Sequence, residues 1–211
     1  MRFIPLLIFA SLSLVISPPA EAPPVPRPLE SATFAAGCFW GVEAAFRKIP
    51  GVVATTAGYT GGHTINPTYR DVYGGNSGHV EAVLVTFDPA KVSYAELLDA
   101  FWTCHDPTID LGADLDQAPH YSAIFFHNPH QEQIARASLK EVEESGVFPR
   151  PIATRLEPAH TFYPAESFHQ HYLERQGIAE SCHVGIAKVH TKLAGVEMIQ
   201  REQSDHIGAL R

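Results

Sequence analysis

Hydrophobic and polar positions change their period several times along the chain, which predicts a mixture of strands and helices. Short apolar runs and period-two alternation predict strands at residues 31–36, 52–59, 79–87, 121–126 and 152–156. Apolar positions three and four residues apart predict helices at residues 39–49, 93–103, 129–145 and 165–175. The Gly- and Asn-rich residues 61–78 predict a loop, and the weak periodicity of residues 176–211 predicts an irregular tail.

The first six predicted elements follow the order βαββαβ, which is typical of a ferredoxin-like two-layer sandwich in the α/β (α+β) class. Extra C-terminal helices, a strand and the irregular tail would extend it. In this fold the first strand lies between the third and fourth strands and is antiparallel to both, whereas the second strand runs the same way as the first. We therefore expect the ends of the first two strands to meet the starts of the next two at one edge of the sheet.

Composition indicates one globular domain, which we place at residues 31–211. The 211-residue chain is 45% hydrophobic and 18% charged, long enough to bury one sizeable core. The formal net charge is −8 and no run of Lys or Arg occurs, which disfavours nucleic acid and anionic membranes as partners. We expect a monomer without a stable membrane partner.

The first residues have the layout of a secretory signal peptide, which we place at residues 1–22. Arg2 precedes the apolar residues 3–16, and Ala20-Glu21-Ala22 offers a cleavage site. The apolar stretch is shorter than the roughly 20 residues that span a bilayer, so an uncleaved membrane anchor is the less favoured alternative. Residues 23–30 form a Pro-rich linker. We expect an exported protein, periplasmic or otherwise extracytoplasmic.

Cys38 is the candidate nucleophile among the three cysteines. It opens a predicted helix between Gly37 and Gly41, where free backbone N–H groups and the helix dipole favour a thiolate and predict a lowered pKa. Phe39 and Trp40 follow it and offer an apolar wall that suits a methyl or thioether group. The alternative is a buried cysteine among core aromatics.

Several blocks of the sequence resemble the peptide methionine sulfoxide reductase A family. They are Gly37-Cys38-Phe39-Trp40-Gly41, Ala57-Gly58-Tyr59-Thr60-Gly61-Gly62, Asn66-Pro67-Thr68-Tyr69, Gly78-His79-Val80-Glu81-Ala82-Val83, His105-Asp106-Pro107-Thr108, Tyr121-Ser122-Ala123-Ile124, and Ala165-Glu166 with His169-Gln170. The resemblance covers about residues 31–182 and implies reduction of methionine-S-sulfoxide, in proteins, in peptides or as the free amino acid, which repairs oxidative damage.

The resemblance also implies roles for residues at the predicted sheet edge. The Cys38 thiolate would attack the sulfoxide sulfur, and Glu81 would protonate the departing oxygen if burial keeps its carboxyl protonated. Tyr59 and Tyr121 would hydrogen-bond that oxygen, with Phe39 and Trp40 binding the substrate. Considered alone, Glu81 and the tyrosines are equally compatible with ordinary sheet positions.

A second thiol would resolve the resulting sulfenic acid to a disulfide. Cys182, in the tail where the family often carries its resolving cysteine, is the candidate, and Cys104 is expected to be a packed thiol. The implied reductant is an external dithiol protein of the thioredoxin type, and no other cofactor is expected.

The approach to the fourth predicted strand departs from the family pattern of Asp, Gly and Gln-Tyr-Arg-Ser. This chain reads Asp116-Gln117-Ala118-Pro119-His120-Tyr121-Ser122, so an Arg is missing and His120 replaces Gln. The family aspartate binds the main-chain amide of the substrate. That role passes to Asp116, with Asp114 as the rival.

Two other function classes remain open. A cysteine hydrolase would combine Cys38 with a histidine base and form an acyl-enzyme, but no histidine lies close in sequence. A thiol- or metal-binding module would bind metal without turnover. The 12 histidines include no His-x-x-x-His pair and the chain has no Cys-x-x-Cys, so we expect no metal site.

Overall fold

The computed structural model describes residues 28–109 and 119–178. Six strands form one sheet in the order β5-β4-β1-β3-β2-β6. Their bounds are Glu30–Ala36 (β1), Val52–Thr60 (β2), Val80–Phe87 (β3), Ser122–Phe126 (β4), Arg155–Pro158 (β5) and Tyr163–Pro164 (β6). β1 is antiparallel to β3 and β4, and β2 is antiparallel to β3. This confirms the predicted ferredoxin-like arrangement, which β5 extends as a parallel edge strand and β6 as an antiparallel one.

The helices are α1 (Phe39–Arg47), α2 (Tyr69–Tyr73), α3 (Tyr94–Cys104), α4 (Pro129–Ser145) and α5 (Tyr172–Arg175). The two long helices show clear start signals. Ser93 and Glu96 form a reciprocal capping box at α3, and the Asn128 side chain accepts from the Gln131 N–H at α4. Gly146 then ends α4 in the left-handed conformation at φ 66°. Local sequence thus determines where both helices begin and where α4 ends.

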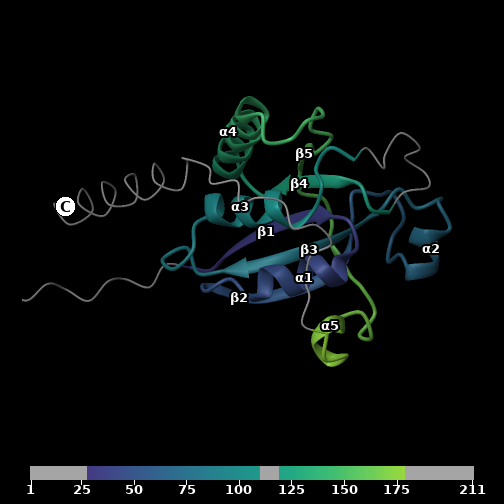
Figure 1. Ribbon diagram of the computed structural model, residues 1–211. Helices are drawn as coiled ribbons and strands as arrows, with labels where there is room; N and C mark the ends of the chain where they lie inside the picture. Colours follow the sequence, from purple (N-terminus) through teal and green to yellow (C-terminus); the bar gives the residue numbers. More distant parts are fainter. Residues whose placement is uncertain (1–27, 110–118, 179–211) are drawn as a thin grey trace, which may run out of the picture.

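The three longest helices pack on one face of the sheet, and α1 and α3 lie in front of the strands in Figure 1. The main core between them is rich in aromatic rings. Phe34 of β1 stacks on Phe46 of α1 with ring centroids 4.8 Å apart, and Phe101 of α3 packs against it at 5.6 Å. The other face carries a smaller cluster of Ala35, Val80, Ala82, Tyr121, Ala123 and Phe125, against which Phe162 packs. The larger part of the core therefore lies on the face that the helices cover.

Three predicted segments differ from the structure. The predicted loop at 61–78 contains the short helix α2, which a Thr68–Asp71 capping box begins. The predicted helix at 165–175 is helical only in α5, because backbone turns precede it and His171 takes a positive φ of 52°. The strand predicted at 152–156 lies at 155–158, where it pairs with β4. Within the described residues, none of the helices is long and apolar enough to cross a membrane.

Candidate active site

The sheet topology brings four chain segments to one edge, as the strand order predicted. Tyr59 near the end of β2 pairs with Glu81 near the start of β3. Ala36 at the end of β1 pairs with Ser122 at the start of β4. Gly37, at a positive φ of 87°, then turns the chain from β1 into α1. Cys38 thus reaches the edge where Glu81 lies.

Cys38 is the N-cap residue of α1 and is half-buried. Burial and the charge of Glu81 raise the pKa of the Cys38 thiol, while the backbone N–H groups of Trp40 and Gly41 oppose this shift. The expected helix-terminus effect is present, but the predicted net lowering of the pKa is wrong. Burial of the thiol, together with the charge of Glu81, outweighs the helix terminus, and sequence periodicity reveals neither effect.

Glu81 is the buried carboxyl of the site, with 1% of its surface exposed. The Phe39 N–H donates to its Oε2 over 2.9 Å, which ties the carboxyl to the first residue of α1. The Tyr73 hydroxyl donates to Oε1 over 3.0 Å, and Nε2 of His120 lies 3.4 Å from Oε2. Glu81 is therefore held next to Cys38 by α1, α2 and the segment before β4.

Tyr73 and His120 belong to the site although neither was predicted there. Tyr73 Oη lies 2.9 Å from His120 Nε2, so the hydroxyl bridges the imidazole and the carboxyl. Burial, the Tyr69 hydroxyl and the charge of Glu81 raise the pKa of Tyr73, so its hydroxyl stays protonated. The Tyr69 ring packs 4.2 Å from that of Tyr73 and continues the wall of the site.

Tyr121 does not join these residues. It is 6% exposed and belongs to the small cluster on the opposite face of the sheet, with the Arg155 guanidinium 4.3 Å above its ring. Successive residues of a strand face opposite sides, so Tyr121 shares the side of Ala123 and Phe125. This chain lacks the Arg that the family pattern has between Tyr and Ser. With one residue fewer before Ser122, the side chain that faces Glu81 is that of the residue before Tyr121. Tyr121 therefore does not lie where the predicted contact with the sulfoxide oxygen requires it. His120 lies beside Glu81 instead.

Tyr59 lies on the same face as Glu81 but is fully buried. Its hydroxyl donates to Glu166 Oε2 over 3.0 Å, and its ring lies 5.9 Å from that of Phe39. The second Glu166 oxygen accepts from the Tyr69 N–H over 2.9 Å. Tyr59 therefore lies in the floor of the site, where its hydroxyl is bonded to the glutamate that also holds α2, and its role toward the sulfoxide oxygen stays a prediction.

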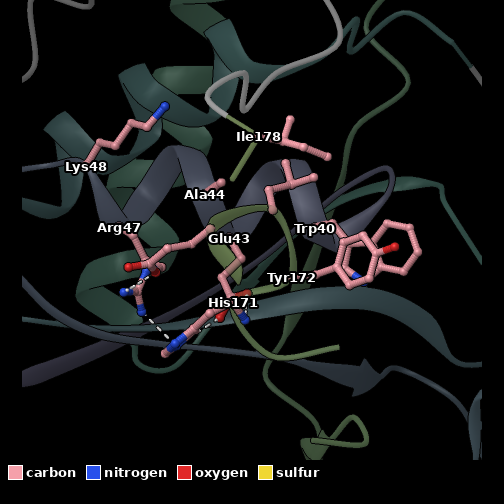
Figure 2. A pocket seen from close by; sticks show the side chains of 10 residues that line it. Trp40, Glu43, Ala44, Arg47, Lys48, His171, Tyr172 and Ile178 are labelled. Atoms are coloured by element: carbon pink, nitrogen blue, oxygen red, sulfur yellow. Dashed lines mark hydrogen bonds and ion pairs between the residues drawn. The ribbon is translucent and has the colours of Figure 1, made fainter. Parts of the chain in front are cut away.

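Phe39 and Trp40 differ in exposure, because Phe39 is buried and Trp40 is half-buried. The Trp40 indole N–H donates to Nδ1 of His169 over 3.1 Å. Its ring stacks on Tyr172 of α5 at 3.9 Å, which Figure 2 shows as two overlapping rings. The predicted apolar wall consists of Trp40 at the surface with Phe39 behind it.

Figure 2 also shows how α5 is held against α1, around a cavity of about 310 Å³. Glu43 is buried and accepts from the backbone N–H of His171 over 2.7 Å and from the Thr55 hydroxyl over 3.2 Å. Burial raises the pKa of Glu43, opposed by these hydrogen bonds. Arg47 lies 2.7 Å from the His171 ring and pairs with Glu174 at 2.8 Å. These contacts fix Tyr172 over Trp40.

Two predicted site residues, Asp116 and Cys182, lie outside the described residues, as do the predicted signal peptide and most of the linker. Cys104 is buried at the end of α3, where its thiol donates to the Phe101 carbonyl over 3.3 Å. It has the packed environment that was expected. Within residues 28–109 and 119–178, no group of three or more His, Cys, Asp or Glu side chains is placed to hold a metal ion.

Comparison with known proteins agrees with this geometry. The family model described as peptide methionine sulfoxide reductase matches residues 30–202. The chain belongs to this family. MsrA proteins of Methanoculleus marisnigri and Geobacter sulfurreducens are 54% and 55% identical, over 72% and 71% of this chain and 93% of each relative. The protein is therefore a peptide-methionine (S)-S-oxide reductase, an oxidoreductase with a cysteine-based mechanism.

Solved structures of the family share the fold. Methionine sulfoxide reductase A of Corynebacterium diphtheriae aligns with a TM-score of 0.65 at 33% identity, covering 77% of this chain and 84% of that one. Reduced Mxr1 of Saccharomyces cerevisiae aligns with a TM-score of 0.65 at 29% identity, covering 74% and 90%. The mixed sheet with helices on one face is thus the architecture of a methionine sulfoxide reductase.

Sequence reasoning missed His120, Tyr73, Tyr69, Glu166 and His169 as parts of the site. Two kinds of sequence signal pointed to some of them, namely a place in a block that resembles the family and the departure from the family pattern before β4. Tyr69 closes a block that resembles the family, and His120 stands at the family departure before β4. The sequence signal for His169 was its place in a block that resembles the family. Its ring is buried against that of Phe39, with the ring centroids 5.1 Å apart.

Proposed function

We propose that Cys38 is the nucleophile that reduces methionine-S-sulfoxide, free or within peptides and oxidised proteins, and that Glu81 supplies the proton. The observation that carries this proposal is the 2.9 Å hydrogen bond from the Phe39 N–H to Glu81, which holds a buried carboxyl beside the half-buried thiol. A thiolate and a proton donor in one site are what sulfoxide reduction requires.

The reaction moves two electrons and one oxygen. The Cys38 thiolate attacks the sulfoxide sulfur while the oxygen takes a proton from the Glu81 carboxyl. Transfer of the hydroxyl to the Cys38 sulfur releases methionine and leaves Cys38 as a sulfenic acid, so the sulfoxide sulfur is reduced and the cysteine sulfur is oxidised. Protonation of Glu81 also removes the charge that raises the pKa of the thiol, which favours the attacking thiolate.

Cys182 is the proposed resolving cysteine. Its thiol attacks the sulfenic acid of Cys38, which forms a disulfide and releases water. Cys182 follows Ile178 by four residues, and Ile178 lines the cavity beside α1 that Trp40 also lines. Four residues span at most about 14 Å. The described part of the chain therefore ends beside α1, the helix that begins next to Cys38. An external dithiol protein of the thioredoxin type then reduces the disulfide. Separately, Asp116 is proposed to bind the main-chain amide of the substrate.

The test uses the reduced protein and a peptide that carries each epimer of methionine sulfoxide. We expect reduction of the S epimer and, without added reductant, a Cys38–Cys182 disulfide in peptide maps. Cys38→Ser should abolish turnover, whereas Cys104→Ser is the matched control because Cys104 is packed in the core. Turnover by Cys38→Ser would overturn the proposal. A Cys38–Cys104 bridge would correct only the resolving step.

The hydrolase alternative lacks support at the thiol. The groups that shift the pKa of Cys38 are a carboxylate and two backbone N–H groups, not the imidazole that activates a hydrolytic cysteine. A carboxyl suits proton delivery to an oxide. An acyl-enzyme trapped with a thioester substrate would favour the hydrolase instead.

Export is proposed from residues 1–22, whose composition is that of a signal peptide. In an oxidising compartment a dedicated extracytoplasmic dithiol donor would be needed to keep Cys38 reduced. Cell fractionation with N-terminal sequencing of the mature protein tests this. A cytoplasmic protein that retains Met1 would refute export and leave the reductase activity untouched.

A further inference from the structure

His120 reaches the active site through two contacts of its imidazole ring. Its Nε2 lies 2.9 Å from Tyr73 Oη and 3.4 Å from Glu81 Oε2, while Tyr73 donates to the other Glu81 oxygen. Because the Tyr73 hydroxyl donates its hydrogen to Glu81, its oxygen can accept a hydrogen bond from an Nε2–H of His120. Two hydrogen bonds and one ion-pair contact therefore link the three groups.

The backbone determines that His120, rather than its neighbour, faces Glu81. The carbonyl of Pro119 accepts from the Glu81 N–H over 2.7 Å, which anchors the residue before His120 to the start of β3. β4 then begins at Ser122, and alternation sends Tyr121 to the opposite face. His120 stands on the face of Ser122 and Glu81, so its position follows from pairing with β3 and β1.

His120 also connects the buried carboxyl with water. The Glu81 side chain is 1% exposed, whereas that of His120 is 28% exposed. Tyr73, whose raised pKa keeps its proton in place, is a poor proton source. Imidazole is the side chain that most readily exchanges a proton near neutral pH.

We propose that His120 is the proton-supplying and positioning partner of Glu81, a part that this chain adds to the reaction proposed above. As imidazolium, His120 passes a proton to the Glu81 carboxylate, directly or through the Tyr73 hydroxyl. Glu81 delivers that proton to the sulfoxide oxygen, and neutral His120 regains one from water. Within the described residues, the charged and titratable groups that face His120 are Glu81 of β3 and Tyr73 of α2.

Two substitutions separate proton supply from simple positioning. His120→Gln keeps an amide that can hydrogen-bond Tyr73 and Glu81 but cannot carry a proton, and His120→Ala removes both functions. The readout is the single-turnover rate of methionine formation from pH 5 to pH 9, which excludes the recycling steps. We expect both variants to lose about tenfold or more, within the range of acid–base catalysis, and to lose the basic-side decline of the wild-type profile.

Chemical rescue supplies an independent readout. Because His120 lies partly at the surface, added imidazole should restore part of the rate of His120→Ala and none of that of His120→Gln, whose amide fills the space. His127→Gln is the matched control, since its Nε2 lies 2.8 Å from the Thr33 hydroxyl at the other end of β4. That variant should keep the wild-type profile.

The outcomes distinguish this inference from the proposed function. A wild-type protein that does not reduce the S epimer refutes the proposed function itself. An active wild type whose His120→Gln variant keeps the wild-type rate and pH profile refutes the role of His120 alone. Loss in His120→Ala with full activity in His120→Gln would reduce the role to positioning and refute proton supply.

Discussion

Glu81→Gln should have opposite effects on the reactivity of Cys38 and on turnover. The substitution keeps the size of the side chain but removes its charge and its capacity to donate a proton. Glu81 contributes to the raised pKa of Cys38, so the pKa of the thiol should fall in the variant. Cys38 should then react faster with an alkylating reagent at neutral pH, because the thiolate fraction is larger. Sulfoxide reduction should nevertheless slow.

The magnitude follows from the contacts of Glu81. General acid catalysis contributes about 10²–10⁴-fold in rate, equivalent to about 2.7–5.4 kcal/mol of transition-state stabilisation. The amide oxygen of Gln can still accept from the Phe39 N–H, and its NH₂ group can donate to the Tyr73 oxygen. We therefore expect the free energy of unfolding to fall by no more than about 1–3 kcal/mol, the range for one impaired buried hydrogen bond. The loss of rate should far exceed any loss of folded protein.

The assay pairs two measurements on one sample. Alkylation of the Cys38 peptide by iodoacetamide is followed by mass spectrometry across pH, and methionine formation is followed in a single turnover. Glu43→Gln is the matched control, because Glu43 is another buried glutamate that accepts from a backbone N–H, on the α5 side of α1. It should leave the titration of Cys38 unchanged. A Glu81→Gln variant with wild-type turnover, or with an unshifted alkylation profile, would refute the reasoning.

Three further predictions concern other parts of the structure. Tyr121→Phe should retain wild-type activity because Tyr121 lies on the opposite face of the sheet, whereas Tyr73→Phe should lower kcat/KM by about tenfold through the lost hydrogen bond to Glu81. Equal losses in both would contradict this assignment. Ser138→Ala should lower the free energy of unfolding in urea by about 1–3 kcal/mol, since it leaves the buried Trp102 N–H without its acceptor at 2.8 Å; an unchanged midpoint would argue against that bond. Burial lowers the pKa of His105 to about 4 from 6.5, so its contribution to stability is present above pH 6.5 and is lost as the pH falls towards 4. Urea midpoints of His105→Gln should therefore depend less on pH in that window than those of the wild type, and equal slopes would refute it.

The sequence by itself determined much of the scaffold. Hydrophobic patterns placed β1, α1, β3 and α4 close to their observed bounds, because α1 and α4 bury one face each and β1 and β3 are short segments buried almost throughout. The element order predicted the strand order, and the strand order brought Cys38 and Glu81 to the same edge. The cysteine, its helix and its acidic neighbour could therefore be found without coordinates.

Only the tertiary structure decided the direction in which the pKa of Cys38 is shifted and the identity of the side chains around Glu81. The pKa of Cys38 depends on burial and on a charge 43 residues away in the chain, which no local pattern encodes. The choice between Tyr121 and His120 depends on strand pairing, because a shift of one residue moves a side chain to the other face of a sheet. Matching a motif aligns residue types, whereas the backbone hydrogen bond between Glu81 and Pro119 determines which residue faces the carboxyl. The nucleophile and its acidic neighbour were thus readable from the sequence, whereas the contacts of Tyr73 and His120 with Glu81 were readable only from the fold.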